Sequence, residues 1–324
     1  MRYIEDLKEE ERLIEHYLCK VKRSMRSKNG KAYYSLVLQD KTGSIDAKIW
    51  DVTNDIGPFE EDDFVKIDSM VTLYQGELQL KIVKIRKSQE GEYQPMDYIP
   101  CTKGDIPTMC DEVLGLISSV GNSYMRRLLE DILINDEEIS RAFRSHSAAK
   151  SMHHNYFGGL LEHTLAVANL CSFLASRYRG ANRDILITAA LLHDIAKIYE
   201  LSPFPTNNYT DEGRLIGHVV MGAQLIAERT ARIEGFPKAL SAMIQHCILS
   251  HHGEYEFGSP KLPQTIEAFI LHVADNADAK IKVFEDTLDN SSADTWVGIE
   301  KSMFKRDLRR SSFGEKTYVA EEKE

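Results

Sequence analysis

The N-terminal part of the chain alternates apolar and polar residues with a period of two. Runs rich in β-branched and aromatic side chains predict strands at 17–22, 33–39, 44–50, 64–74 and 77–86. Turn signals such as Asn29-Gly30 and Gln75-Gly76 separate them. Because no long helical pattern intervenes, we predict a small closed barrel of the oligonucleotide-binding (OB) type, with a small sandwich or an SH3-like barrel as the alternative. A short charged helix is expected before the barrel, over residues 1–15.

Beyond the strands the apolar period changes to that of helices. Residues 89–107 contain Pro95, Pro100 and Pro107 and predict a linker. Helices are then predicted at 108–118, 122–133, 136–145, 159–179, 182–199, 213–233, 237–252, 263–287 and 294–308. The chain is therefore predicted to be multidomain. It would comprise a small all-β OB-type barrel at 1–88, the linker, an all-α helical bundle at 108–312 and a polar tail at 313–324.

The composition is that of an ordinary globular protein. With 324 residues, of which 43% are hydrophobic, the chain is long enough for two domains. It has no apolar run of the roughly 18 residues that a membrane helix needs, and its charged N-terminus lacks an apolar signal core. The five cysteines are scattered without a close pair. We therefore expect reduced thiols and a cytoplasmic location, with neither a disulfide framework nor a zinc finger.

The net charge of −10 argues against a general polyanion binder, but the charge is unevenly distributed. Between Lys20 and Lys31 there are six bases and no acid, a local cluster on which a phosphate backbone could dock. Lys22, Arg23 and Arg26 from this cluster are our candidate contacts to a nucleic acid.

Aromatic side chains in the predicted barrel are the second requirement for binding a single strand, because OB surfaces stack bases on aromatic rings. Tyr33 and Trp50 are the candidate platforms. Adjacent Tyr33 and Tyr34 point to opposite faces of a strand, so at most one can stack while the other enters the core. Trp50 ends a predicted strand and is as compatible with the core as with a platform.

The histidines are concentrated in the helical part. Of the 11 histidines, only His16 lies outside residues 146–272, and His193 and Asp194 stand side by side in the apolar run at 189–197. Burying two ionisable groups is costly unless something pairs with them, and a divalent metal satisfies both. A lone histidine there would more often be a satisfied core residue. The other histidine-bearing helices favour a metal site.

Imidazole and carboxylate groups without cysteine favour Mn²⁺, Fe or Mg²⁺ over structural zinc. The candidate ligands are His163, His193, Asp194, His218, His251, His252 and Asp275. They exceed what one ion with an open water position uses, so we predict two metals with Asp194 as the bridge. Such a pair can activate water and clamp a phosphoryl group during in-line displacement.

Asp194 and Lys197 are the candidate catalytic residues. Lys197 lies three residues after Asp194, so on a helix its ammonium group shares the same side. We expect it to hold a phosphate oxygen or the leaving group. An ion pair with Asp194 or with a surface acid is the alternative.

This pattern resembles the HD superfamily of metal-dependent phosphohydrolases, defined by a histidine, an adjacent His-Asp pair and a distant aspartate. Here these are His163, His193-Asp194 and Asp275. The additional histidines at 218, 251 and 252 resemble the subset that holds two metals. The order of an OB-like module before such a domain, together with residues 148–155, 158–164 and 248–254, resembles the YhaM family of bacterial 3′→5′ exoribonucleases. That resemblance implies single-stranded RNA or DNA as the substrate and Mn²⁺ as the favoured metal.

The segment before the first ligand lies outside the general HD pattern. We interpret Lys150, His153, His154 and Asn155 as candidates for binding substrate phosphate or sugar. The alternative is a loop that caps the helix starting near Gly159.

Two rival functions belong to other classes. The first is an HD phosphohydrolase acting on nucleotides or cyclic dinucleotides. The Gly-Tyr-Pro signature of the cyclic-dinucleotide subgroup is absent after His251-His252, and nucleotide hydrolysis has no evident use for an OB-like module. The second is a non-catalytic binder with a vestigial metal site, against which the complete ligand set argues. The expected partner is single-stranded nucleic acid and not a membrane. The sequence leaves open whether the chain forms a homo-oligomer.

Overall fold

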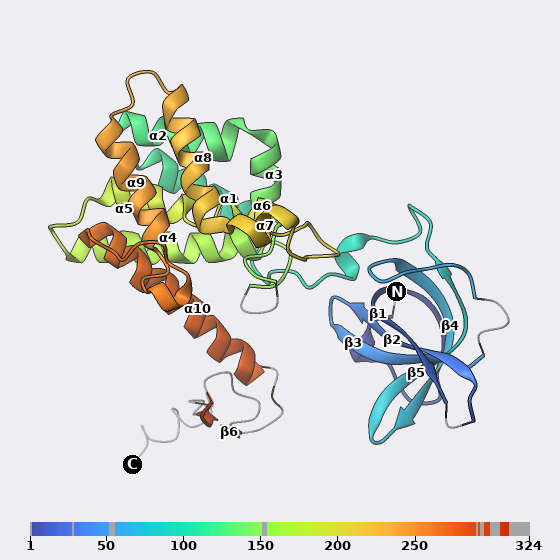
Figure 1. Cartoon of the computed structure of the whole chain (residues 1–324). Coiled ribbons are helices and arrows are strands. Elements are labelled where there is room, and N and C mark those ends of the chain that lie inside the picture. Colours follow the sequence, from blue (N-terminus) through green and yellow to red (C-terminus); the bar gives the residue numbers. More distant parts are fainter. Residues whose placement is uncertain are drawn as a thin grey trace, which may run out of the picture.

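A computed structural model describes residues 2–27, 29–51, 56–150, 154–289, 291, 295–298 and 305–310. The N-terminal part is a closed barrel whose strands neighbour one another in the order β1-β2-β3-β5-β4, with β4 pairing back to β1 (Figure 1). The strands are β1 (Arg12–Arg26), β2 (Ala32–Asp40), β3 (Gly43–Ile49), β4 (Phe64–Tyr74) and β5 (Glu77–Lys87). Among the pairings between these five strands, only that of β3 with β5 is parallel. This is the Greek-key order of an OB fold and excludes the sandwich alternative.

The first strand starts earlier than its sequence suggests. The helix expected over residues 1–15 is absent; within the described residues only Ile4–Asp6 forms a 3₁₀ turn before β1. Leu13 and Tyr17 on β1 are 4% and 0% exposed and pack in the barrel core. These two side chains lie on the same face of the strand. Their burial in the core outweighs the helix propensity of the acidic residues that precede them.

The expected linker is divided between the two domains. The rings of Tyr93 and Phe64 stack with centroids 4.2 Å apart, and Gln39 Nε2 donates to the Tyr98 carbonyl at 3.0 Å. Residues 93–98 therefore pack on the barrel. Just beyond them, the Phe157 amide donates to the Pro100 carbonyl at 2.8 Å. We therefore place the domain division near residue 99.

The C-terminal part is a helical domain with its own hydrophobic core, separate from the core of the barrel (Figure 1). Helix α4 packs against α5 and α10, and α9 packs against α8 and α5. None of the described helices combines the length and the apolar character needed to cross a bilayer. The helices are α1 (Ile106–Ser118), α2 (Ser123–Glu130), α3 (Glu137–Ser145), α4 (Gly159–Arg177), α5 (Arg183–Leu192), α6 (Lys197–Glu200), α7 (Asp211–Ile216), α8 (His218–Arg232), α9 (Lys238–Ser250) and α10 (Ile266–Asp289).

Two predicted helices are broken, and a third is wrong. The helix expected at 182–199 stops at Leu192, and the one expected at 213–233 is interrupted at Gly217, where φ is +79°. The described residues of 294–308 form no helix: β6 (Trp296–Val297) pairs there with β7 (Leu308–Arg309). Val297 and Leu308 are buried in this ladder, so strand pairing covers apolar side chains that the sequence assigned to a helix face. The predicted polar tail, 313–324, lies outside the described residues.

Candidate metal centre

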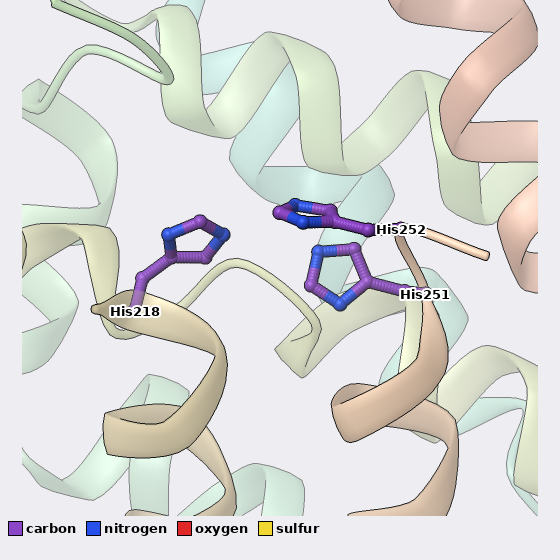
Figure 2. Close-up of side chains that lie close together, drawn as sticks. All are labelled: His218, His251 and His252. Carbon is purple, nitrogen blue, oxygen red and sulfur yellow. The ribbon is translucent and has the colours of Figure 1, made fainter. Parts of the chain in front are cut away.

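The predicted ligands come from different helices and converge on one region of the helical domain. His163 lies in the first turns of α4, and His218 is the first residue of α8. His193 and His251 follow the last residues of α5 and α9. Figure 2 shows the rings from α8 and from the end of α9 facing one another. The geometry therefore gathers side chains that lie more than a hundred residues apart.

One group of ligand atoms comes from α4, the end of α5 and α10. His163 Nε2 lies 3.2 Å from His193 Nε2 and 3.2 Å from Asp275 Oδ1. Asp194 Oδ2 lies 3.4 Å and 3.3 Å from the two imidazole nitrogens. Both histidines and Asp194 are at most 2% exposed.

A second group lies on the other side of Asp194. His218, His251 and His252 bring their ligand atoms within 4.8 Å of one another (Figure 2). Asp194 Oδ1 is 3.4 Å from His218 Nε2 and 3.7 Å from His251 Nε2. Asp194 thus presents one carboxylate oxygen to each group, which is the arrangement of a bridging ligand.

The outer nitrogen of each ligand histidine is held by an oxygen. Carbonyl and carboxylate oxygens only accept, so each Nδ1 carries a proton and Nε2 is the ring nitrogen that could serve as a ligand to a cation. The acceptors are Asp278 for His163 (2.7 Å), the Ala190 carbonyl for His193 (2.8 Å), Glu200 for His218 (2.9 Å), the Ile248 carbonyl for His251 (2.7 Å) and the Phe257 carbonyl for His252 (3.0 Å).

Unpartnered atoms show that the residues fit a metal. Asp194 Oδ1 and His218 Nε2 are buried and accept no hydrogen bond within the described residues. The Nε2 atoms of His163 and His193 face each other at 3.2 Å, and both lie within 3.4 Å of Asp194 Oδ2. Buried polar atoms without hydrogen-bond partners destabilise a fold, and a cation shared between them would remove that cost. The donor set, imidazole with carboxylate, suits divalent ions.

The broken helices are what turn the ligands toward one another. His193 Nδ1 donates a hydrogen bond to the Ala190 carbonyl. In a continuing helix that carbonyl would accept a hydrogen bond from the Asp194 amide. His251 does the same at the end of α9, where it occupies the carbonyl of Ile248. The chain then turns at Gly253, φ +81°, where a Cβ would lie 2.2 Å from the His272 ring. His272 in turn donates Nδ1–H to the His251 carbonyl at 2.9 Å and orients that ligand's backbone.

Lys197 is an ion-pair partner of the bridge. Its Nζ lies 2.6 Å from Asp194 Oδ2. Burial alone would lower the pKa of Lys197, but Asp194 raises it above its ordinary value. Burial likewise opposes ionisation of Asp194, yet Lys197 and His193 hold the pKa of that carboxyl well below its usual range. Lys197 and Asp194 are thus both charged and form an ion pair. An ion pair with Asp194 is the alternative role that the sequence left open for Lys197.

The segment before α4 corrects one sequence-based assignment. His154 is 2% exposed, and its ring nitrogens lie 2.9 Å from Tyr156 Oη and 3.0 Å from Asp278 Oδ2. It therefore supports the Asp278–His163 pair and is not free to bind substrate. A Cβ on Gly159 would lie 2.1 Å from the His154 carbonyl, so this loop packs closely against the first residue of α4.

The other residues of this segment differ in their access to solvent. Lys150 is exposed, and half-buried Asn155 accepts a hydrogen bond from Asn207 Nδ2 at 2.6 Å. His153 lies outside the described residues.

The barrel residues divide into free and engaged side chains. Arg23 and Arg26 are exposed on β1. Lys22, by contrast, has a side chain only 17% exposed: it donates to the Phe59 carbonyl and lies 3.2 Å from Glu60 Oε1. The ammonium group of Lys22 therefore holds the loop before β4, and its contact with nucleic acid stays a prediction.

The two candidate platforms lie together on the barrel surface. Tyr33 and Trp50 stack with centroids 4.7 Å apart, and Trp50 is 48% exposed. Tyr34 packs against the barrel core, so Tyr33 is the outward member of the adjacent pair. Neither platform ring lies in the core.

Two side chains hold the predicted ligands from outside, and the sequence signalled only one of them. Glu200 accepts from both the amide and Nδ1 of His218 at 3.0 Å and 2.9 Å. No spacing rule links residues 200 and 218, so only the fold reveals this contact. Asp278 carried a signal, because it lies three residues after Asp275 on a helix and so faces the same side.

Comparison with known proteins places the chain in a family. A 3′-5′ exoribonuclease YhaM from a Geobacillus species is 34% identical over 263 residues, which are 81% of this chain and 80% of that protein. The 3′-5′ exoribonuclease YhaM of Bacillus pumilus is 34% identical over 280 residues, 85% of this chain and 87% of its own. The chain belongs to the YhaM family.

The HD domain model matches residues 160–280 of this YhaM-family chain, a span that contains all the predicted ligands. Among solved structures, the second OB-fold domain of replication protein A from Methanococcus maripaludis aligns with 28% of the chain and 98% of its own length. That alignment has 20% sequence identity and a TM-score of 0.23. The strand order of the barrel and the HD domain match together make the YhaM-family chain an OB barrel followed by a helical HD domain.

Proposed function

We propose that this protein is a metal-dependent 3′→5′ exonuclease that hydrolyses the phosphodiester bonds of single-stranded RNA. The observation that carries the proposal is the orientation of the ligand histidines. Their Nδ1 atoms are fixed by oxygen acceptors and their Nε2 atoms point to either side of one carboxylate. Its membership of the YhaM family, whose named members are 3′-5′ exoribonucleases, supports the polarity and the substrate class.

The proposed centre divides its ligands between two divalent ions, most suitably Mn²⁺, with Mg²⁺ or Fe as alternatives. His163, His193 and Asp275 would hold one ion. His218, His251 and His252 would hold the other, with Asp194 between them. When bound, such ions activate water and neutralise charge on the phosphate. The protein's part is to fix the imidazoles, keep Asp194 ionised and exclude bulk water from the buried cluster.

In this proposal the barrel binds the single-stranded RNA. Exposed Arg23 and Arg26 suit phosphates, and the stacked pair of Tyr33 and Trp50 offers an aromatic face to a base. These contacts do not depend on a 2′-hydroxyl, so single-stranded DNA is a second substrate to test. The cysteines of the chain are free thiols, which supports a cytoplasmic location.

We expect Lys197→Met to lower turnover on RNA by about a hundredfold, because the ammonium group beside Asp194 is lost. The KM for RNA should change by less than about threefold, since the strand is held elsewhere. Steady-state kinetics at saturating Mn²⁺ would separate the two quantities. A loss confined to KM would assign Lys197 to positioning alone.

The proposal is tested by incubating the purified protein with Mn²⁺ and a 5′-labelled single-stranded RNA. We expect a ladder of labelled products that shortens from the 3′ end and that a chelator abolishes. Immediate appearance of a labelled mononucleotide would indicate the opposite polarity, and internal fragments would indicate an endonuclease. Hydrolysis of free nucleotides with intact RNA would favour the small-molecule phosphohydrolase.

A further inference from the structure

An exposed lysine and an exposed tyrosine meet between two loops near the metal centre. Lys150 Nζ lies 5.5 Å from the centroid of the Tyr209 ring. Lys150 is exposed and Tyr209 is 43% exposed, so both side chains face solvent in a polar surrounding. A tyrosine that is half exposed contributes little to a core. Its position therefore calls for another explanation.

The two loops are fastened together by one buried amide. Asn207, 7% exposed, accepts from Ser147 Oγ at 2.6 Å. Its Nδ2 donates to the Ala149 carbonyl at 3.2 Å and to Asn155 Oδ1 at 2.6 Å. The backbone of Asn207 has φ +43°, a conformation that asparagine tolerates better than other residues with a side chain. The loop that carries Tyr209 is thus held in a fixed position relative to the loop that carries Lys150.

Both loops connect directly to groups that hold metal ligands. The Thr210 amide, next to Tyr209, donates to the Glu200 carbonyl at 3.0 Å, and Glu200 holds His218. On the other loop, the Ala148 amide donates to the His154 carbonyl at 3.1 Å. His154 shares Asp278 with the ligand His163. The exposed pair is therefore linked to the centre through hydrogen bonds of the two loops that carry it.

The same region meets the barrel. Lys20 of β1 donates from Nζ to the Pro205 carbonyl at 3.0 Å while pairing with Asp62 at 2.7 Å. In Figure 1 the loop between α6 and α7 reaches toward the barrel side of the helical domain. An RNA that runs from the basic side chains of β1 to the metal centre meets this loop at the boundary between the domains.

We propose that Tyr209 and Lys150 form a nucleotide subsite for the 3′ portion of a single-stranded RNA. Tyr209 stacks on a base, and Lys150 binds a backbone phosphate. An aromatic ring beside a cation is the combination by which proteins hold single strands without reading their sequence. The subsite rests on the proposed exonuclease function and adds to it a contact that fixes the end of the strand. Asn207 acts as its positioning residue.

The test is a double-mutant cycle in which the Tyr209 ring and the RNA base are removed separately. The kcat/KM of wild-type protein and of Tyr209→Ala is measured on a normal RNA and on one whose 3′-proximal nucleotides lack bases. We expect wild type to prefer the normal RNA by about tenfold or more, the usual worth of a stacked base. Tyr209→Ala should lose most of that preference, and Tyr209→Trp should restore it.

The matched control is Tyr178→Ala at the end of α4. Tyr178 is 53% exposed, but it lies 15 positions after His163, which is about 22 Å along the helix axis. This variant should keep the full preference of wild type. An equal preference in wild type and Tyr209→Ala, with RNA degraded normally, would overturn the subsite alone. If wild type degraded neither RNA, the proposed function would fail instead.

The phosphate contact has an independent readout. Lys150→Gln should reduce the slope of log affinity for RNA against log salt by about 0.7, the value for one phosphate contact of a single strand. An unchanged slope would remove Lys150 from the subsite.

Discussion

Replacing Asp194 with asparagine is expected to abolish RNA hydrolysis, by about a thousandfold or more in turnover. Asparagine keeps the volume of the side chain but removes the charge that the two groups of histidines share. The fold should survive, because the packing of the helical core is unchanged. Turnover with saturating Mn²⁺, together with far-ultraviolet circular dichroism, would measure both effects. Activity within a few-fold of wild type would contradict the bridging assignment.

Asp278→Asn is the matched comparison for that variant. Asp278 contributes no ligand atom to the two groups around Asp194 but accepts from His163 Nδ1 at 2.7 Å. Loss of such an outer acceptor weakens metal affinity by about 10- to 100-fold without removing the centre. We therefore expect Asp278→Asn to need more Mn²⁺ and to recover activity when it is supplied. Asp194→Asn should not recover at any Mn²⁺ concentration.

Removing the barrel is the second change with a large expected effect. A chain that begins at Pro100 should keep the metal centre, because the helical domain has its own core and residues 93–98 leave with the barrel. It should hydrolyse bis-p-nitrophenyl phosphate at a rate comparable to the full chain. Its activity on long RNA should fall, by roughly 1–3 kcal/mol for each stacked base that is lost.

Salt dependence provides the control for the truncation. Activity of the full chain on long RNA should weaken with added salt more steeply than its activity on the small diester, because phosphate contacts release counterions. The truncated chain should lose most of this difference. If truncation left long-RNA degradation and its salt response unchanged, the barrel would not hold the substrate.

The sequence singled out side chains that lie close together in the fold, because metal chemistry restricts residue types at helical spacings. His163, His193 and Asp275 are convergent in the fold even though α5 ends one residue before His193. The break itself was not predictable, because it depends on His193 Nδ1 reaching the Ala190 carbonyl. Apolar periodicity indicates which face of a helix is buried. It does not indicate which side chain donates a hydrogen bond to a backbone carbonyl.

His154 and Lys22 were both predicted to contact the substrate, and the sequence did not show that the fold engages them elsewhere. Both are polar residues whose partners are distant in sequence: Asp278 lies 124 residues from His154, and Phe59 lies 37 residues from Lys22. A local pattern shows that a side chain is charged or polar but not whether the fold already satisfies it. The barrel itself was predictable, since its strands follow period-two alternation and turn signals that require no long-range information.

The most direct measurement of the central claim is anomalous diffraction from crystals of the protein grown with Mn²⁺. We predict two manganese peaks, one on each side of Asp194. One peak should contact His163, His193 and Asp275, and the other should contact His218, His251 and His252. The same experiment on Asp194→Asn should lose at least one peak. Crystals at saturating Mn²⁺ with no peak at these residues, while the protein still degrades RNA, would contradict a two-metal centre bridged by Asp194.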